Sequence, residues 1–237
     1  MFRVDFVTLF PELVEQMLSH SIMGRAQRSG LVRFSAIDPR NFAYDRHRKV
    51  DDTPYGGGPG MVLAAPPIES ALDRLEPDDA TPIILLDAAA PLFHQTDAER
   101  LSRQERLILV CGHYEGVDER VRIELCTEAY SVGSFVVTGG ELPALMLADA
   151  VTRLRPGVLG CQGSYEDDSF YAGGLLGFPL YTRPETFRGV AVPEVLRSGD
   201  HEAISSWRQE QALERTRKYR PDLVEQSDPQ KPGPDRL

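Results

Sequence analysis

Apolar and polar residues alternate at the start of the chain, and a helical spacing of apolar residues follows. The alternation predicts a first strand at residues 2–10. Pro11, a residue type favoured at the first position of a helix, opens an amphipathic segment that reaches about Ile22, with Leu13 and Met17 spaced i,i+4. A strand followed by a helix indicates an α/β fold.

The same succession continues over the first two thirds of the chain. Further strands are predicted at residues 31–37, 83–86, 107–111 and 132–137, and helices at residues 66–76, 96–104, 116–126 and 142–154. Thr96 and Glu99 have the spacing of a capping box at the start of the second helix. Leu145, Ala148 and Val151 would lie along one side of the last helix. This order predicts a mostly parallel sheet that binds ligands at the carboxyl ends of its strands.

The rest of the chain is organised around residues 107–155. The apolar runs 107–111 and 132–137 each end at a glycine-punctuated turn, and such turns bring backbone amides close to a ligand. Together they could hold a flat heteroaromatic ring, and an uncharged adenosine suits them better than a pyrophosphate. A tight turn without a ligand explains each glycine when it is considered alone. It explains less readily why one sheet brings three such turns together. The residues concerned are Gly112, Gly133, Gly139 and Gly140, beside Tyr114 and Glu115.

Residues 38–61 show almost no apolar periodicity and carry four glycines near their end. Long stretches of this kind inside a compact domain are usually functional or disordered. Their charged residues suit a loop that binds an anionic, hydrogen-bonding partner, and a solvated surface loop explains them equally well. These residues are Asp45, Arg46, His47, Arg48, Lys49, Asp51 and Asp52. The glycines make a poor phosphate cradle, because Pro59 removes an amide donor and no Lys-Ser/Thr pair follows.

The last third of the chain has a different character. Glycine and acidic residues without periodicity predict an interdomain linker at residues 161–177, after a first domain at residues 1–160. A small helical domain is predicted at residues 178–224 and a flexible tail at 225–237. Ser198 or Asp200 would cap its helix, with Ile204 and Trp207 turned inward. Basic residues near the helix end could contact phosphates or simply complement the helix dipole: Arg208, Arg215, Arg217, Lys218 and Arg220.

Composition narrows the function classes. The chain has 237 residues, 41% of them apolar, and a net charge of −10, which argues against indiscriminate coating of nucleic acid but permits a selective RNA enzyme. No signal peptide or membrane-spanning run is visible, so we expect a cytoplasmic protein with no membrane or DNA partner. Cys111, Cys126 and Cys161 lack ligand spacing and are expected to be buried thiols, with no metal site. The sequence also lacks GxGxxG after the first strand, GxxxxGK[ST], HExxH and GxSxG.

Six motifs nevertheless resemble one known family. They are VCGHYEGVDERV, SVGSFVVTGGELPA, RPGVLG, EDDSF, YTRPE and DRHRKVDDTPYGGGPGM, and they resemble the bacterial tRNA (guanine-N1)-methyltransferases of the TrmD type in the SPOUT superfamily. The resemblance runs in order from Phe2 to about Leu223. It implies a SPOUT-type α/β domain with a deep trefoil knot, an exception to the rule of unknotted chains, and a small helical C-terminal domain. It also implies a homodimer whose active site lies at the subunit interface.

The resemblance further implies a reaction. S-adenosyl-L-methionine would bind in the knot, and its methyl group would pass to N1 of the guanine immediately 3′ of the anticodon when another guanine precedes it. Asp168 falls on the family's general base and Arg153 on an arginine that stabilises charge on O6. The implied tRNA contacts are Arg46, Asp51, Ser164 and the basic helix after Trp207. Mg²⁺ is implied by the resemblance alone.

The implied cofactor site draws on the glycine turns and the apolar run between them. Its residues are Leu86, Gly112, Tyr114, Glu115, Val132, Gly133, Ser134, Phe135, Val136, Val137, Gly139 and Gly140. One departure concerns the adenine side, where the family usually has Ser-Pro-x-Gly after the leucine and this chain has Asp87-Ala88-Ala89-Ala90. Without the resemblance, Glu166, Asp167 and Asp168 would be interpreted as a solvated acidic turn.

Other functions remain open from the sequence. A SPOUT methyltransferase that acts on another RNA base is the main alternative. A non-catalytic RNA-binding factor would need neither Asp168 nor Arg153, and both are present. A nucleotide-binding oxidoreductase would need a phosphate-binding turn, which the sequence does not show.

Overall fold

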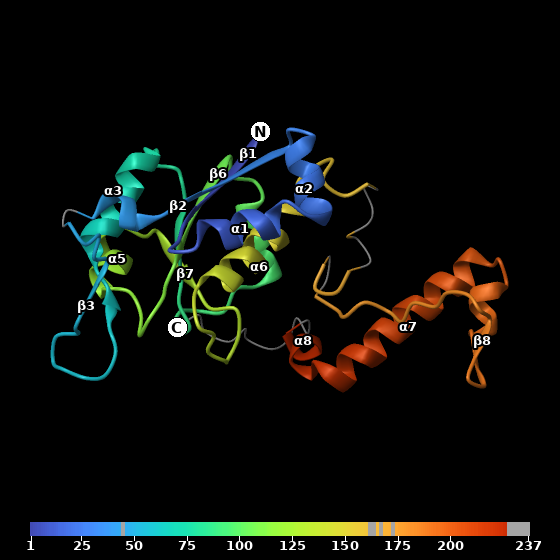
Figure 1. The fold of residues 1–237 in the computed structure, drawn as a ribbon. Helices are drawn as coiled ribbons and strands as arrows, with labels where there is room; N and C mark the ends of the chain where they lie inside the picture. Colours follow the sequence, from blue (N-terminus) through green and yellow to red (C-terminus); the bar gives the residue numbers. More distant parts are fainter. Residues whose placement is uncertain (44–45, 161–164, 166–167, 172–173, 227–237) are drawn as a thin grey trace. The chain divides into compact units, whose positions relative to one another are not determined.

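The computed structural model describes residues 1–43, 46–160, 165, 168–171 and 174–226, and it divides into two compact units (Figure 1). The first unit comprises residues 1–160, and the second begins at residue 161. Parts of the predicted linker and the end of the predicted tail lie outside the described residues. Among the described residues, no helix is both long and apolar enough to cross a bilayer.

A five-stranded sheet forms the core of the first unit, and all of its strand pairs are parallel. In spatial order the strands are β2 (Val32–Ile37), β1 (Phe2–Val7), β6 (Arg106–Cys111), β5 (Ile83–Leu86) and β7 (Glu128–Tyr130). Val4 lies opposite Phe34 on one side and Leu107 on the other, so apolar residues align across the sheet. The α/β class and the mostly parallel sheet are therefore confirmed.

Helices cover both faces of this sheet (Figure 1). One face packs against α1 (Pro11–Leu18), α2 (Ser21–Arg28), α4 (Gln95–Leu101) and α6 (Glu141–Thr152), and the other against α3 (Ala65–Leu75) and α5 (Glu119–Glu124). Successive strand residues point to opposite faces, so Leu109 joins the first core while Ile108 and Val110 join the second. Such two-sided burial explains the near-continuous apolar runs of the strands.

The first predicted helix divides into two. Val14 and Leu18 form the buried side of α1, whereas Leu13 and Met17, which made the segment look amphipathic, are 41% and 57% exposed. The chain then turns, and α2 begins at Ser21 with a φ of 52°. The sequence pattern missed α2, because nothing in it marks a break at this point.

Two of the other helices test predicted details. In α6 the side formed by Leu145, Ala148 and Val151 is buried, as expected. The predicted cap of α4 is wrong, because the backbone N–H of His94 donates to the carboxylate of Asp97 at 3.0 Å. The helix therefore begins before the Thr96–Glu99 pair that was expected to start it.

The predicted strand at residues 132–137 is also wrong. These residues form an irregular loop in which Phe135 and Val136 are exposed. The position beside β5 is already occupied by Glu128–Tyr130, a three-residue strand that the sequence did not reveal. The apolar run lines a pocket and does not join the sheet.

Short elements occupy the stretch that was predicted to be without regular structure. A 3-10 turn, η1 (Pro39–Phe42), is followed by a small antiparallel hairpin of β3 (Asp51–Asp52) and β4 (Val62–Leu63). The glycines of this stretch lie between the two strands, and Gly56, Gly57 and Gly58 all have positive φ.

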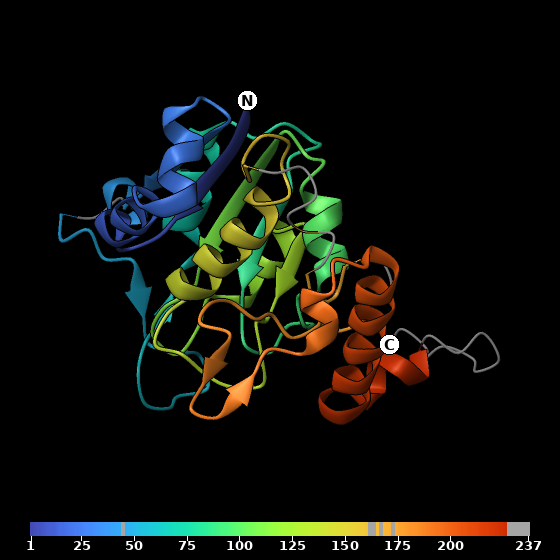
Figure 2. The same ribbon diagram turned by 90° about the vertical axis from the view of Figure 1, so that its right-hand side faces the viewer.

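The second unit is built on one long helix (Figure 2). Its elements are β8 (Thr186–Phe187), β9 (Val190–Ala191), η2 (Glu194–Arg197), α7 (His201–Tyr219) and α8 (Pro221–Gln226). Asp200 caps α7 by accepting hydrogen bonds from the N–H groups of Glu202 and Ala203, each at 3.0 Å. The ring of Trp207 packs 6.3 Å from that of Tyr181.

Candidate functional site

Loops at the carboxyl ends of β5, β6 and β7 enclose a pocket in the first unit. This is the edge of a parallel sheet at which ligands are expected. The pocket has apolar walls, backbone-rich glycine turns and two carboxylates. Its lining comprises residues 85–88, 112–117, 130–132, 135–140 and Pro143.

The glycine turns bring two loops into direct contact. The N–H of Gly140 donates to the carbonyl of Gly112 at 2.7 Å, and His113 forms a bridge with Gly139. A Cβ on Gly140 would lie 2.6 Å from the Gly112 nitrogen and 2.8 Å from the Cα of Cys111, so only glycine fits. Backbone is thereby exposed to the pocket at the point where the loops meet.

Gly140→Ala is expected to lower the free energy of unfolding by about 1–3 kcal/mol, because the new methyl group meets backbone that cannot rotate away. Urea denaturation measures this change. The control is Gly160→Ala, since nothing lies within 4 Å of a Cβ built there. Its expected effect is about 0.5 kcal/mol or less. Equal denaturation midpoints for the two variants would contradict the close approach.

The hairpin loop that was predicted to contact an anionic partner is joined to this pocket. The N–H of Glu115 donates to the carbonyl of Met61, and that of Leu63 to the carbonyl of Gly116, each at 3.0 Å. Tyr114, with a φ of 62°, forms a bridge with Val62. The β3–β4 hairpin and the pocket therefore form one continuous surface.

Carboxylates supply the charge of the pocket. Glu115 and Asp87 line it, and Asp87 accepts a hydrogen bond from the N–H of Ala89 at 3.0 Å. The carbonyl of Asp87 also accepts from Ala90 at 3.2 Å, so the Asp87–Ala90 sequence forms a tight turn without proline or glycine.

Beneath the pocket lies a buried acid. The carboxylate of Glu141 is shielded from solvent and accepts a hydrogen bond from the hydroxyl of Thr8 at 2.8 Å. Its other oxygen lies 4.0 Å from Nδ1 of His113. Burial, together with the charge of Glu141, raises the pKa of the Cys111 thiol well above its ordinary value. Burial likewise raises the pKa of Cys126 to about 12.

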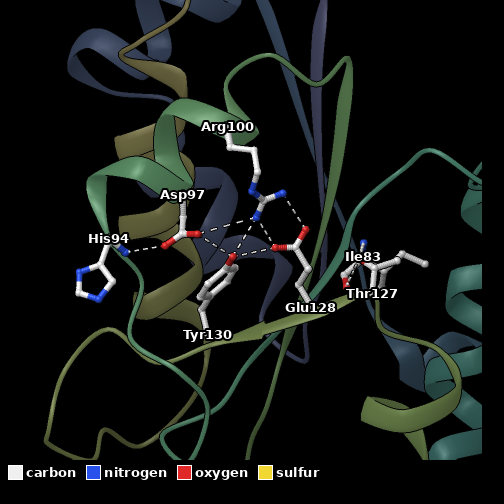
Figure 3. Close-up of polar contacts among 7 residues, drawn as sticks. All are labelled: Ile83, His94, Asp97, Arg100, Thr127, Glu128 and Tyr130. Atoms are coloured by element: carbon white, nitrogen blue, oxygen red, sulfur yellow. Dashed lines mark hydrogen bonds and ion pairs between the residues drawn. The ribbon is translucent and has the colours of Figure 1, made fainter. Parts of the chain in front are cut away.

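A polar network surrounds Tyr130, one of the residues that line the pocket (Figure 3). The Tyr130 hydroxyl lies 2.7 Å from a carboxylate oxygen of Glu128 and 3.0 Å from one of Asp97. Arg100 donates to Glu128 at 3.0 Å and to the Tyr130 oxygen at 2.9 Å. Burial and then the bond to Glu128 raise the pKa of Tyr130. The network joins α4 to β7 and explains why a strand begins with a glutamate.

The predicted cofactor residues mostly converge on this pocket. Those that line it are Leu86, Gly112, Tyr114, Glu115, Val132, Phe135, Val136, Val137, Gly139 and Gly140. Gly133 and Ser134 lie in the same loop without lining the pocket, and the Phe135 ring fills the space beside Gly133. Asp87, His113 and Tyr130 were missed, although each adjoins a glycine turn or a strand end.

The two predicted catalytic residues lie in different units. Arg153 is the partly buried residue that caps the C-terminus of α6. Burial raises the pKa of Asp149, one turn earlier, and the positive charge of Arg153 only partly offsets this rise. Asp168 is exposed in a turn of the second unit, where its N–H donates to the carbonyl of Tyr165 at 3.2 Å. Glu166 and Asp167 lie outside the described residues.

The predicted RNA contacts are only partly described. Arg46 is exposed and Asp51 partly buried, and Ser164 lies outside the described residues. In the part of the chain that the structure covers, no group of three or more His, Cys, Asp or Glu side chains could hold a metal ion.

Comparison with known proteins identifies the family. The family model described as tRNA (Guanine-1)-methyltransferase TrmD matches residues 2–226 of this chain. A tRNA (guanine-N(1)-)-methyltransferase of Moorella thermoacetica is 52% identical over 225 residues, which cover 94% of this chain and 90% of that protein. One from Staphylococcus aureus strain JH9 is 48% identical over 223 residues, 94% of this chain and 91% of its own length. With a match over nearly its whole length, the chain belongs to the TrmD family of tRNA (guanine-1)-methyltransferases.

Proposed function

We propose that this chain transfers the methyl group of S-adenosylmethionine to N1 of the guanine immediately 3′ of the anticodon in tRNA. The observation that carries the proposal is the pocket at the carboxyl ends of β5, β6 and β7, in a chain whose relatives are named tRNA (guanine-N(1)-)-methyltransferases. The trefoil knot that the sequence resemblance implies is part of the same proposal.

The residues of the pocket fit the proposed methyl donor. Leu86, Val132 and Val137 offer apolar contact to an adenosine, and the glycine turns at Gly112 and Gly140 offer backbone groups to its polar edge. S-adenosylmethionine supplies a methyl group on a positively charged sulfur when bound. The carboxylate of Glu115 complements that charge and the charge of the donor's ammonium group.

Asp168 and Arg153 have distinct roles in the proposed reaction. Guanine N1 carries a proton at neutral pH, so it becomes nucleophilic only when a base removes that proton, and Asp168 accepts it. Negative charge then spreads onto O6 of the guanine. The guanidinium of Arg153 stabilises this charge with fork-shaped donors.

Recognition of tRNA is proposed for the surface beside the pocket. Asp51 begins β3 and pairs with Leu63 of β4, whose N–H is hydrogen-bonded to the pocket loop, and Arg46 precedes β3. Ser164 and the basic part of α7 would complete the contact. Sequence-specific reading of RNA uses unstacked bases in loops, and an anticodon loop offers such bases.

We propose a homodimer that completes the active site across its interface. An exposed apolar surface on the neighbouring helices α1 and α6 supports this assembly. It comprises Leu13, Met17, Leu142 and Met146, which are 41% to 57% exposed. Large apolar side chains exposed on two helices that contact each other are typical of a protein interface. Asp168 of one subunit would then act with Arg153 of the other.

Methyl transfer from labelled S-adenosylmethionine to unmodified tRNA tests the function. One transcript carries guanine 3′ of the anticodon with guanine before it, and the matched control replaces only the target guanine with adenine. We expect label on the first transcript alone. Equal labelling would move the target elsewhere in RNA, as in a SPOUT enzyme of different specificity. Cofactor binding without any labelling would instead favour a non-catalytic RNA-binding factor.

A further inference from the structure

One residue of α7 differs from the rest of that exposed helix. Thr216 is fully buried, and it is the only buried residue of α7. Its hydroxyl donates to the carbonyl of Ala212 at 2.7 Å and accepts a hydrogen bond from the N–H of Leu176 at 2.9 Å. The second bond ties the helix to a segment 40 residues earlier in the chain.

That segment, which we call the strap, comprises residues 168–171 and 174–177. Its far end carries a second bond to α7, since the guanidinium of Arg215 donates to the carbonyl of Gly177 at 3.1 Å. The N–H of Gly177 in turn donates to the hydroxyl of Ser169 at 2.9 Å. Thr216 and Arg215, adjacent in the helix, thus bind Leu176 and Gly177, adjacent in the strap. Gly177 also binds Ser169, which directly follows Asp168.

The end of the strap next to Asp168 is also held in place by contacts. Phe170 has a φ of 71°, and its N–H donates to the carbonyl of Leu175 at 2.8 Å. The guanidinium of Arg220 lies 5.7 Å from the centroid of the Phe170 ring. A bulky residue in the left-handed region is strained, and it persists only where its surroundings hold it there. Contacts from α7 and the end of the strap supply that constraint.

We propose that Thr216 is a positioning residue for Asp168. The inference rests on the proposed function, in which Asp168 is the base. The hydroxyl of Thr216 fixes Leu176, Leu175 fixes Phe170, and Phe170 stands two residues after the carboxylate that takes the proton. Arg215 and Arg220, for which the sequence left phosphate contact and complementing the helix dipole open, contact the same strap from α7 and its C-terminal end.

Thr216→Val tests the inference, because valine keeps the volume of threonine and removes only the hydroxyl, leaving the N–H of Leu176 without its partner. We expect kcat for methyl transfer to fall about 10- to 100-fold, since small displacements of a catalytic group have effects of this size. The KM for S-adenosylmethionine should stay unchanged, and the pH dependence of kcat should change shape. Thr216→Ser should restore both kcat and the pH profile.

The matched control is Ser205→Ala, which removes an exposed hydroxyl from the same helix. Arg215→Met breaks the neighbouring bond at an exposed position and should lower kcat in the same way, so the test survives if Thr216→Val does not fold. Wild-type kcat and an unchanged pH profile in both Thr216→Val and Arg215→Met would overturn the inference. So would failure of Thr216→Ser to recover kcat.

The failure of this inference and that of the proposed function are distinguishable. If the wild type methylates tRNA, Asp168→Asn is inactive and Thr216→Val is fully active, then only the positioning role is wrong. If Asp168→Asn is as active as the wild type, then the base has been wrongly assigned, and the role of Thr216 is overturned with it.

Discussion

Asp168→Asn is expected to lower kcat for tRNA methylation by about 10²- to 10⁴-fold, the usual contribution of a general base. An amide of the same shape cannot take the N1 proton, so the guanine remains a poor nucleophile. Single-turnover transfer from labelled S-adenosylmethionine measures the chemical step. Cofactor affinity should be retained, because the pocket lies in the first unit and Asp168 in the second.

The control for this prediction is Glu210→Gln, which neutralises an exposed acid of α7. It should leave the rate unchanged. A wild-type rate for Asp168→Asn would exclude this carboxylate as the base. A loss of cofactor affinity equal to the loss of rate would show that the variant damages the pocket, so the lower rate could not be assigned to a missing proton acceptor.

Mixed subunits extend the same experiment to the proposed dimer. Arg153→Met and Asp168→Asn chains are each expected to be inactive alone. If each site takes one residue from each subunit, a mixed dimer has one site with both native residues, and random pairing restores about a quarter of wild-type activity. No recovery in verified mixed dimers would place both residues of a site in one subunit.

Asp5→Ala is expected to lower the free energy of unfolding by about 3–5 kcal/mol, the usual cost of removing one partner from a buried ion pair. Asp5 is 2% exposed and accepts a bond from the guanidinium of Arg106 at 2.7 Å. Arg106 also donates to the carbonyl of Leu75 at 2.8 Å, at the end of α3. The variant leaves this guanidinium, whose side chain is only 11% exposed, without its countercharge.

Urea denaturation measures the effect of Asp5→Ala. Glu119→Ala provides the control, because the pair of Glu119 and Arg122 is exposed on α5 and should be worth less than about 1 kcal/mol. Equal losses in the two variants would show that the Asp5 pair is effectively solvated.

The sheet could be predicted where its strands show a clear pattern of apolar residues. Apolar and polar residues alternate in β1 and β2, and β5 and β6 are mainly apolar runs, so the pattern of apolar residues found all four. β7 is three residues long and begins with Glu128, whose charge is satisfied by Arg100, a partner that no local pattern reveals. The run at 132–137 was wrongly predicted to be a strand, because apolar residues that line a pocket give the same sequence pattern as apolar residues of a core.

The candidate site could be found from its glycines, but not all of its side chains could. The turns at Gly112 and Gly140 predicted a close approach of backbone, and in the structure these two residues are hydrogen-bonded to each other. Asp87 and Tyr130 reach the pocket because β5, β6 and β7 end side by side, a result of strand order. The relation of Asp168 to the basic helix was also invisible, because the bond from Leu176 to Thr216 spans 40 residues.

The network around Tyr130 bears on the solubility of the chain. β7 is an edge strand, and edge strands present unpaired backbone groups that can recruit strands of other molecules. Here the edge is only three residues long, Ser131 beyond it is already paired with Pro91 and Phe93, and the charges of Arg100 and Glu128 stand beside it. An incoming strand would find few free amides and would have to desolvate an ion pair. This edge of the sheet is therefore protected against aggregation.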